Sequence, residues 1–215
     1  LPLAYSNGTY ADGRPWVNLN FYGYTGGAGG AFQTDGWGLY PPVMTGVILP
    51  SIEMNELQYP SRVLKHEYVP DFTGPGQYRG APGLEVKIQH LEKSYTSVMM
   101  AGVRNTTRGL AGGGDAPSNL VILDDRRTEP LEVRETAFHV GMEPGGIITF
   151  HRAGGGGWGH PYARDPERVL EDVRNGLVTA SAAETEYGVV IEEESGLLRV
   201  NGRLTEQLRS QSDTR

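Results

Sequence analysis

Residues Gly145–Pro161, GGIITFHRAGGGGWGHP, combine a strand pattern with a long run of glycines. Ile147, Ile148 and Phe150 predict a short buried strand, and four consecutive glycines, Gly154–Gly157, follow it. Because glycine has no Cβ, this backbone can reach positive φ and lie very close to another group. Two interpretations are open: successive N–H groups form an anion-binding nest, or the glycines form a tight packing crossover. No Lys-Ser/Thr pair follows, so the stretch is not a P-loop.

The composition favours a fold with many turns and close backbone contacts. The 215 residues are enough for one good domain or two small ones. Hydrophobic residues make up only 38%, while there are 31 glycines and 14 prolines. The glycines cluster between strand-like segments and show no collagen period. We therefore expect a β-rich fold that buries part of its surface against a partner.

Charge and cysteine usage narrow the function classes. The net charge is −7 and no basic stripe is present, so a nucleic-acid partner is not expected. The absence of cysteine excludes disulfides, thiolate nucleophiles and Cys-ligated zinc, and favours the cytoplasm. No segment has the length of a membrane span and no signal peptide is visible, so no membrane partner is expected. The sequence opens at Leu1 without a methionine, which leaves a processed or cleaved chain open.

The order of the patterns predicts an α+β fold. Strands joined by Gly-rich loops are expected over residues 1–152. A Gly loop, a helix pair and a β-hairpin over 153–206 are expected to pack on them, and the polar tail 207–215 to be disordered. Asp165-Pro166 and Thr179 are start signals for the two helices.

A short helix is predicted within Pro50–Tyr59, with Ile52 and Leu57 pointing inward. Glu53 and Glu56 are spaced i, i+3, so the helix places both carboxylates on one face. Such a pair can bind a metal, orient a cation or act in acid–base chemistry. The alternative is a solvated helix face.

The remaining candidates lie in glycine-rich loops. Asp35 belongs to a turn signal in the first glycine cluster, for which a wide loop between strands is the alternative to a ligand loop. Arg79 either binds an anion or pairs with a neighbouring acid. His151 and His160 bracket the central glycines; a metal there would also need a carboxylate, and ordinary loop hydrogen bonding is the alternative.

Four stretches occur in the order seen in hydantoinase B proteins, and from about Gly26 to about Ile191 the chain resembles the C-terminal part of that family. The stretches are GGAGGAFQTDGWG, PSIEMNELQYPSRVLKHEYVPDFTGPGQYRG, GLAGGGDAP and GGGGWGHPYARDPERVLEDVRNGLVTASAAETEYGVVI. The family includes the large subunit of ATP-dependent N-methylhydantoinases, the C-terminal half of 5-oxoprolinase, and a subunit of the acetone and acetophenone carboxylases.

The resemblance implies that the chain is one portion of a larger machine. The metal-associated stretches of the family's first half are absent here, so a divalent metal is expected on an N-terminal hydantoinase B-like portion and none on this chain alone. His160 stands where the family commonly has Asp or Asn. The chain is accordingly expected to be a split subunit, a cleavage product or the C-terminal piece of a larger protein.

The resemblance also implies a two-component reaction in a hetero-oligomer. A hydantoinase A-like partner uses ATP to phosphorylate a carbonyl or lactam oxygen of a small-molecule substrate, and the activated intermediate is then hydrolysed in the hydantoinase B-like component. An acetone-carboxylase-like subunit and a non-catalytic assembly domain are the alternatives. No catalytic residue is assigned; the candidates for substrate or phosphate contact are Asp35, Glu53, Glu56, Arg79, Gly155, Gly156 and His160.

Overall fold

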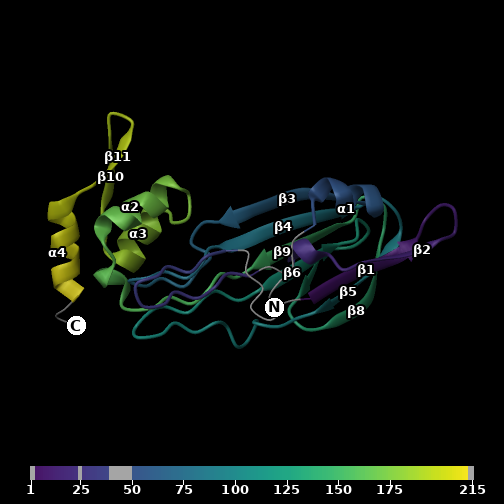
Figure 1. The fold of residues 1–215 in the computed structure, drawn as a ribbon, viewed down its shortest axis with the longest axis horizontal. Helices are drawn as coiled ribbons and strands as arrows, with labels where there is room; N and C mark the ends of the chain where they lie inside the picture. Colours follow the sequence, from purple (N-terminus) through teal and green to yellow (C-terminus); the bar gives the residue numbers. More distant parts are fainter. Residues whose placement is uncertain (1–2, 24–25, 39–49, 213–215) are drawn as a thin grey trace.

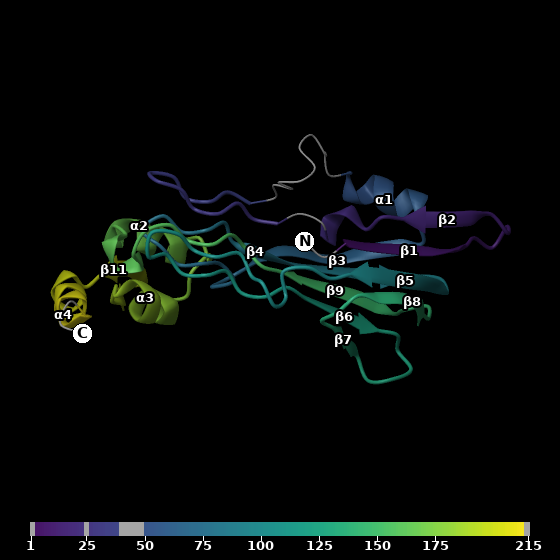
Figure 2. The same cartoon turned by 90° about the horizontal axis from the view of Figure 1, so that it is seen from below.

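The computed structural model describes residues 3–23, 26–38 and 50–212. The molecule is elongated, with two β-sheets at one end and the C-terminal helices at the other (Figure 1). Long glycine-rich segments connect the two ends and lie side by side between them (Figures 1 and 2). Over the described residues, no helix combines the length and the apolar character that crossing a membrane requires.

Two antiparallel sheets pack face to face. The four-stranded sheet has the order β2-β1-β5-β8, and Figure 2 shows it in the foreground. Its strands are β1 (Leu3–Thr9), β2 (Pro15–Asn18), β5 (Ser94–Met99) and β8 (Ala137–Met142). The five-stranded sheet has the order β3-β4-β9-β6-β7. Its strands are β3 (Ser61–Val69), β4 (Gly83–His90), β6 (Leu120–Asp124), β7 (Leu131–Val133) and β9 (Ile147–Arg152).

The core lies between these sheets. Val86, Ile88, Ile148 and Phe150 from the five-stranded sheet are at most 1% exposed and contact Val98 of the other sheet within one cluster. Burying a side chain of this size contributes about 1.5–3 kcal/mol. The register places Val86 opposite Phe150 and Ile88 opposite Ile148. The buried strand predicted from Ile147, Ile148 and Phe150 is therefore β9, in the centre of its sheet.

Helix α1 (Ile52–Gln58) packs beside β3 and begins where the sequence predicts, with the Ser51 side chain accepting from the Met54 N–H. Ile52 packs against the core, as expected. The inward orientation expected for Leu57 is wrong, because its side chain is 82% exposed. A helix of two turns presents only a narrow face to a sheet, and Asn55 fills the buried position instead. A 3₁₀ turn, η1 (Phe21–Gly23), precedes this region in the chain.

The C-terminal part has its own small core. It comprises η2 (Pro161–Ala163), α2 (Pro166–Arg174), α3 (Ala180–Tyr187), β10 (Ile191–Glu194), β11 (Leu197–Val200) and α4 (Gly202–Ser212). Asp165 caps α2 and Thr179 caps α3 through side-chain oxygens, so both predicted helix starts are confirmed. Val169, Ala183 and Tyr187 pack together inside this unit. The predicted α+β, β-rich fold with a helix pair and a β-hairpin is confirmed.

The expectation of a disordered tail from residue 207 is wrong for residues 207–212. These residues belong to α4, and the Arg209 guanidinium donates to the backbone carbonyls of Arg164 and Tyr187. These polar contacts hold the segment in place, and they leave no apolar periodicity in the sequence that would predict it. Residues 213–215 lie outside the described part of the chain.

Candidate functional site

Four glycine-rich segments meet between the sheets and the helices, and Gly154–Gly157 runs through their centre. The Gly154, Gly155 and Gly157 N–H groups donate to the carbonyls of Phe72, Ala81 and Gly114 at 3.0, 3.1 and 2.9 Å. In return, Gly74 and Gly30 donate to the carbonyls of Gly155 and Gly156, both at 2.8 Å, and Leu110 donates to the Gly157 carbonyl at 2.9 Å. We call this arrangement the glycine array.

The glycine array needs glycine because its backbones touch. A Cβ built on Gly155 would lie 2.0 Å from the Ala28 carbonyl oxygen, and one on Gly157 would lie 2.0 Å from the Pro75 oxygen. Real Cβ contacts are never this short. Positive φ occurs at Gly159 (74°) but at none of the described residues 154–157. Close approach, rather than unusual φ, is therefore what requires these four glycines.

These hydrogen bonds bear on the two interpretations of the glycine run. An N–H group that already donates to a carbonyl is not available to an anion. At Gly154, Gly155 and Gly157 the geometry therefore favours the packing crossover. Contact of Gly155 or Gly156 with a phosphate stays a prediction.

A buried ion cluster joins the glycine array to the helices. The Arg164 guanidinium donates to both oxygens of Asp35, at 2.7 and 2.9 Å, and to Asp172 at 2.8 Å. Arg79 donates through Nε to Asp172 at 2.9 Å, and Arg168 donates to Asp35 at 2.8 Å. Arg164 is 2% and Asp172 4% exposed. Of the two alternatives for Arg79, the structure shows pairing with a neighbouring acid.

The ion cluster favours the charged forms of Asp35 and Arg164. Burial alone raises the pKa of the Asp35 carboxyl, but the hydrogen bond from Arg164 and the charges of Arg164, Arg79 and Arg168 outweigh burial and leave the pKa below its usual value. Burial likewise lowers the pKa of Arg164, and the hydrogen bond to Asp35 with the charges of Asp172 and Asp35 reverses the effect. Three guanidinium groups face two carboxylates, so the cluster carries a net charge of +1.

Sequence reasoning missed Arg164 and Asp172. A signal for Asp172 was present: it follows Val169 by three positions on α2, so it shares the apolar face that packs inward. A carboxylate on a buried face must be paired. Its partners are Arg79 and Arg164. Only the fold shows that these three residues meet.

A polar cavity lies where the glycine array meets the sheets. Its volume is about 310 Å³, and its wall includes Thr106, Thr107, Asn119, Arg152 and Gly154. Arg152 is 1% exposed, and burial lowers its pKa to about 9, so the guanidinium is still cationic at neutral pH. Asn119 fixes the wall, because its amide donates to the Ala101 carbonyl and accepts from the Ala153 N–H, both at 2.9 Å.

This cavity is the best candidate for a small polar or anionic ligand, because it joins a buried cation, hydroxyl groups and an amide in one hollow. Sequence reasoning did not single out Arg152. The available signal was a charged residue at the end of an otherwise apolar buried strand, β9.

The other predicted residues lie apart from the cavity. The Glu53 carboxylate accepts from the Ser51 hydroxyl, and Glu56 accepts from the Val63 N–H at 2.8 Å. Both belong to α1, at the sheet end of the molecule (Figure 1). His160 caps η2, with Nδ1 accepting from the Tyr162 N–H at 3.2 Å. In the part of the chain that the structure describes, no group of three or more His, Asp or Glu side chains is arranged to hold a metal ion.

Comparisons with known proteins identify the family of this chain. The family model described as Hydantoinase B/oxoprolinase matches residues 3–161. Caprolactamase subunit beta from Pseudomonas jessenii is 32% identical over an alignment of 185 residues, and the match covers 82% of this chain and 32% of that protein. The match is therefore to about a third of the relative's length.

Two solved structures share the fold. The crystal structure of ATP-dependent caprolactamase from Pseudomonas jessenii superposes with a TM-score of 0.83 at 25% identity, covering 97% of this chain and 37% of that one. Nucleotide-free acetone carboxylase superposes with a TM-score of 0.81 at 19% identity, covering 100% of this chain and 33% of that one. The family-model match to residues 3–161 includes all four segments of the glycine array. This chain therefore belongs to the Hydantoinase B/oxoprolinase family.

Proposed function

We propose that this chain is the C-terminal portion, or a split subunit, of the hydrolytic component of an ATP-dependent complex that opens cyclic amides such as lactams or hydantoins. The observation that carries the proposal is the 32% identity to caprolactamase subunit beta over 82% of this chain. The fold shared with ATP-dependent caprolactamase supports it.

The physical reasoning starts from the amide bond. An amide carbonyl is a poor electrophile, and converting its oxygen into a phosphate ester supplies a leaving group. The component that receives the activated intermediate must hold an anion and exclude stray water. The cavity with Arg152 offers a buried cation and hydrogen-bond donors for such a group. In this proposal the chain contributes one wall of the site.

The other parts of the reaction belong to partners. ATP binds a hydantoinase A-like subunit, and the divalent metal binds the N-terminal hydantoinase B-like portion, so the complex is a hetero-oligomer. The described residues of this chain hold no cluster that fits a metal. Because the ATP and metal sites lie on partners in this proposal, we expect this chain to be inactive alone.

A non-catalytic assembly domain is the second candidate function. The observation that favours it is the ion cluster, in which Asp35 and Arg79, two of the candidates for substrate contact, are paired with Arg164 and Asp172. An acetone-carboxylase-like activity has less support, because the 19% identity to acetone carboxylase supports similarity of fold alone.

The test is reconstitution of the complex from purified components. ATP hydrolysis is measured with ε-caprolactam, hydantoin or 5-oxoproline present, with and without this chain. The proposal predicts substrate hydrolysis that requires the chain. Turnover that is unchanged when the chain is omitted contradicts it, and turnover that requires bicarbonate identifies a carboxylase.

A further inference from the structure

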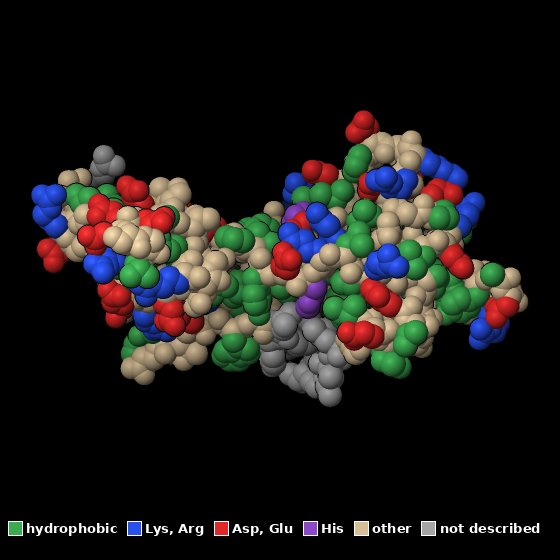
Figure 3. All heavy atoms as spheres, turned by 90° about the horizontal axis from the view of Figure 1, so that it is seen from above, with side chains coloured by type: hydrophobic (Ala, Val, Ile, Leu, Met, Phe, Trp, Pro, Cys, Tyr) green, Lys and Arg blue, Asp and Glu red, His purple; other side chains and the backbone are tan. Residues whose placement is uncertain are grey.

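The outer faces of the two sheets differ in charge. The five-stranded sheet carries a network of ion pairs. Lys65 and Lys87 both contact the Glu85 carboxylate, and Lys65 Nζ also lies 3.5 Å from Glu67 Oε2. Figure 3 looks onto this side of the molecule and shows Lys, Arg, Asp and Glu side chains spread over it. A sheet face of this kind is solvated.

The four-stranded sheet has no such charges. Its strands read LAYSNGT, PWVN, SYTSVM and AFHVGM, and these described segments contain no Lys, Arg, Asp or Glu. The inward positions are occupied by residues such as Ala4, Trp16 and Val98. The outward positions of this sheet do not face the core, yet they too lack charged side chains.

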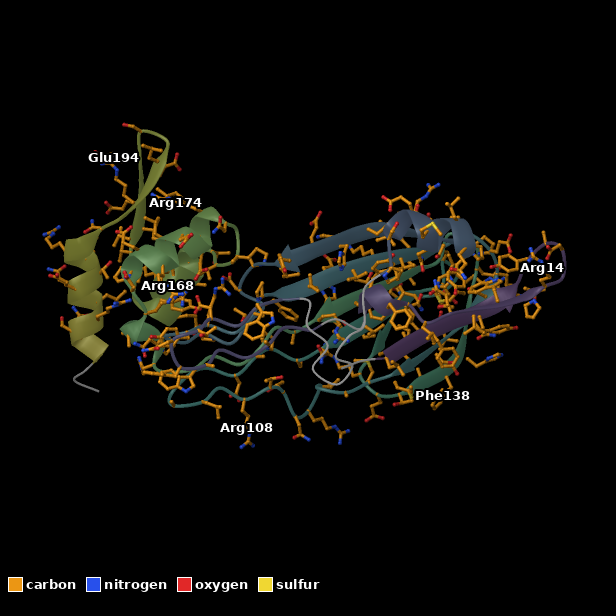
Figure 4. All side chains as sticks on the ribbon, viewed as in Figure 1. Arg14, Arg108, Phe138, Arg168, Arg174 and Glu194 are labelled. Atoms are coloured by element: carbon orange, nitrogen blue, oxygen red, sulfur yellow. The ribbon has the colours of Figure 1, made fainter. Side chains whose placement is uncertain are left out.

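Several outward side chains of this sheet are exposed. Val17, Tyr95 and Met99 are 55%, 37% and 38% exposed. The register places Asn7 opposite both Val17 and Tyr95, and the Tyr95 ring stacks on His139 with ring centres 3.9 Å apart. Phe138, 64% exposed, projects from β8 at the lower margin of the sheet (Figure 4). We call Val17, Tyr95, Met99, Phe138 and His139 the uncharged face.

Depletion of charge together with exposed aromatic and aliphatic side chains is typical of the centre of a stable protein interface. A free sheet surface alternates apolar inside with polar or charged outside, as the five-stranded sheet of the same molecule does. The uncharged face therefore has the composition of a buried surface.

We propose that the uncharged face is the docking surface for the N-terminal hydantoinase B-like portion of the subunit, on the same polypeptide or on a separate chain. This inference rests on the proposed function for the identity of the partner. In caprolactamase subunit beta and in the solved caprolactamase chain, the matched segment is only about a third of the length, so a large remaining part of those proteins is available to pack against this segment. Because the face lacks Lys, Arg, Asp and Glu, we expect the affinity of the contact to depend little on salt.

The test compares lysine substitutions on the two sheets. Val17→Lys and Met99→Lys place a charge on the uncharged face; Leu64→Lys is the matched control, since Leu64 is 46% exposed on β3 of the other sheet. Each variant is co-expressed with the N-terminal hydantoinase B-like portion, and the Kd is measured by biolayer interferometry at low and high salt. Circular dichroism melting checks that each variant is folded.

The expected result is at least a tenfold increase in Kd for Val17→Lys and Met99→Lys and less than a twofold change for Leu64→Lys. Equal binding by all three variants overturns the inference. Self-association of the chain that Val17→Lys abolishes also overturns it, because the occupant is then a second copy. A wild-type complex that assembles through this face but does not hydrolyse cyclic amides contradicts only the proposed function.

Discussion

Arg164 donates two hydrogen bonds to Asp35, which lies 129 residues away in the sequence, at 2.7 and 2.9 Å. The pair connects the first glycine segment to Arg164, the C-cap of η2, between η2 and α2. Asp172 then links Arg164 to Arg79. The orientation of the helices relative to the glycine array is therefore fixed by paired charges as well as by apolar packing.

Replacing Arg164 is expected to be strongly destabilising. Arg164→Met leaves Asp35 and Asp172 without their shared partner, and removing one member of a buried ion pair costs about 3–5 kcal/mol. Chemical denaturation measures the change. Arg168→Met is the control, because the Arg168 side chain is 43% exposed and its pair with Asp35 is expected to contribute at most about 1 kcal/mol. Similar losses in the two variants would contradict a structural role centred on Arg164.

Gly155→Ala is expected to disrupt the glycine array. The new methyl group would lie 2.0 Å from the Ala28 carbonyl oxygen, and neighbouring backbone cannot move aside cheaply. The expected loss exceeds about 4 kcal/mol, in the range reserved for severe overpacking. Gly202→Ala is the matched control, because a Cβ at Gly202 meets no atom within 4 Å and alanine favours a helix. Thermal melting separates the two variants, and equal melting temperatures would show that the array tolerates side chains.

The His90 imidazole is expected to make the fold less stable as the pH falls. Burial lowers the pKa of His90 to about 4, whereas an unfolded chain has a histidine pKa of about 6.5. Below pH 6.5 the unfolded state therefore binds a proton that the folded state does not. Stability should fall as the pH drops from about 6.5 to 4, by up to about 3 kcal/mol.

His90→Gln should remove that part of the pH dependence, measured as the free energy of unfolding at pH 7 and pH 4.5. An unchanged slope in His90→Gln would assign the acid sensitivity to other groups.

The cavity beside Arg152 gives a prediction for activity in the reconstituted complex. Thr107→Trp should fill the cavity and reduce substrate-dependent ATP turnover at least tenfold, because Thr107 lies on the cavity wall. Thr185→Trp adds the same bulk to a different cavity of about 370 Å³ next to α3, and should leave turnover within twofold of wild type. Steady-state kinetics measures both. Full activity of a folded Thr107→Trp variant would remove this cavity from the proposed site.

Much of the fold could be predicted because local signals were strong. Alternating apolar residues marked β3, β4 and β9, and Asp165-Pro166 and Thr179 marked the starts of α2 and α3. The inward orientation of Leu57 and the disorder of residues 207–212 were predicted wrongly. Which face of a short helix is buried, and whether a polar tail is held, depend on neighbours distant in the sequence.

The candidate site shows the same division. Asp35 was a candidate because it belongs to a turn signal in a glycine cluster, and Arg79 because it lies in a glycine-rich loop. Their partners Arg164 and Asp172 come from the C-terminal part of the chain. Arg152 is an ordinary strand residue in the sequence, and only the packing of glycine segments beside β9 puts it on a cavity wall.

The amino-acid sequence was sufficient to place strands such as β4 and β9, the starts of α2 and α3 and the clusters of glycine. It also shows that the segments forming the four-stranded sheet lack charged residues. Only the folded structure shows that close backbone contact requires those glycines. Only the folded structure shows that the uncharged segments share the outer surface of one sheet. The physical reason is that backbone contact, ion pairing and surface composition are properties of segments brought together in space. Periodicity along the chain records the burial of one element, and carries no information about which other element covers it.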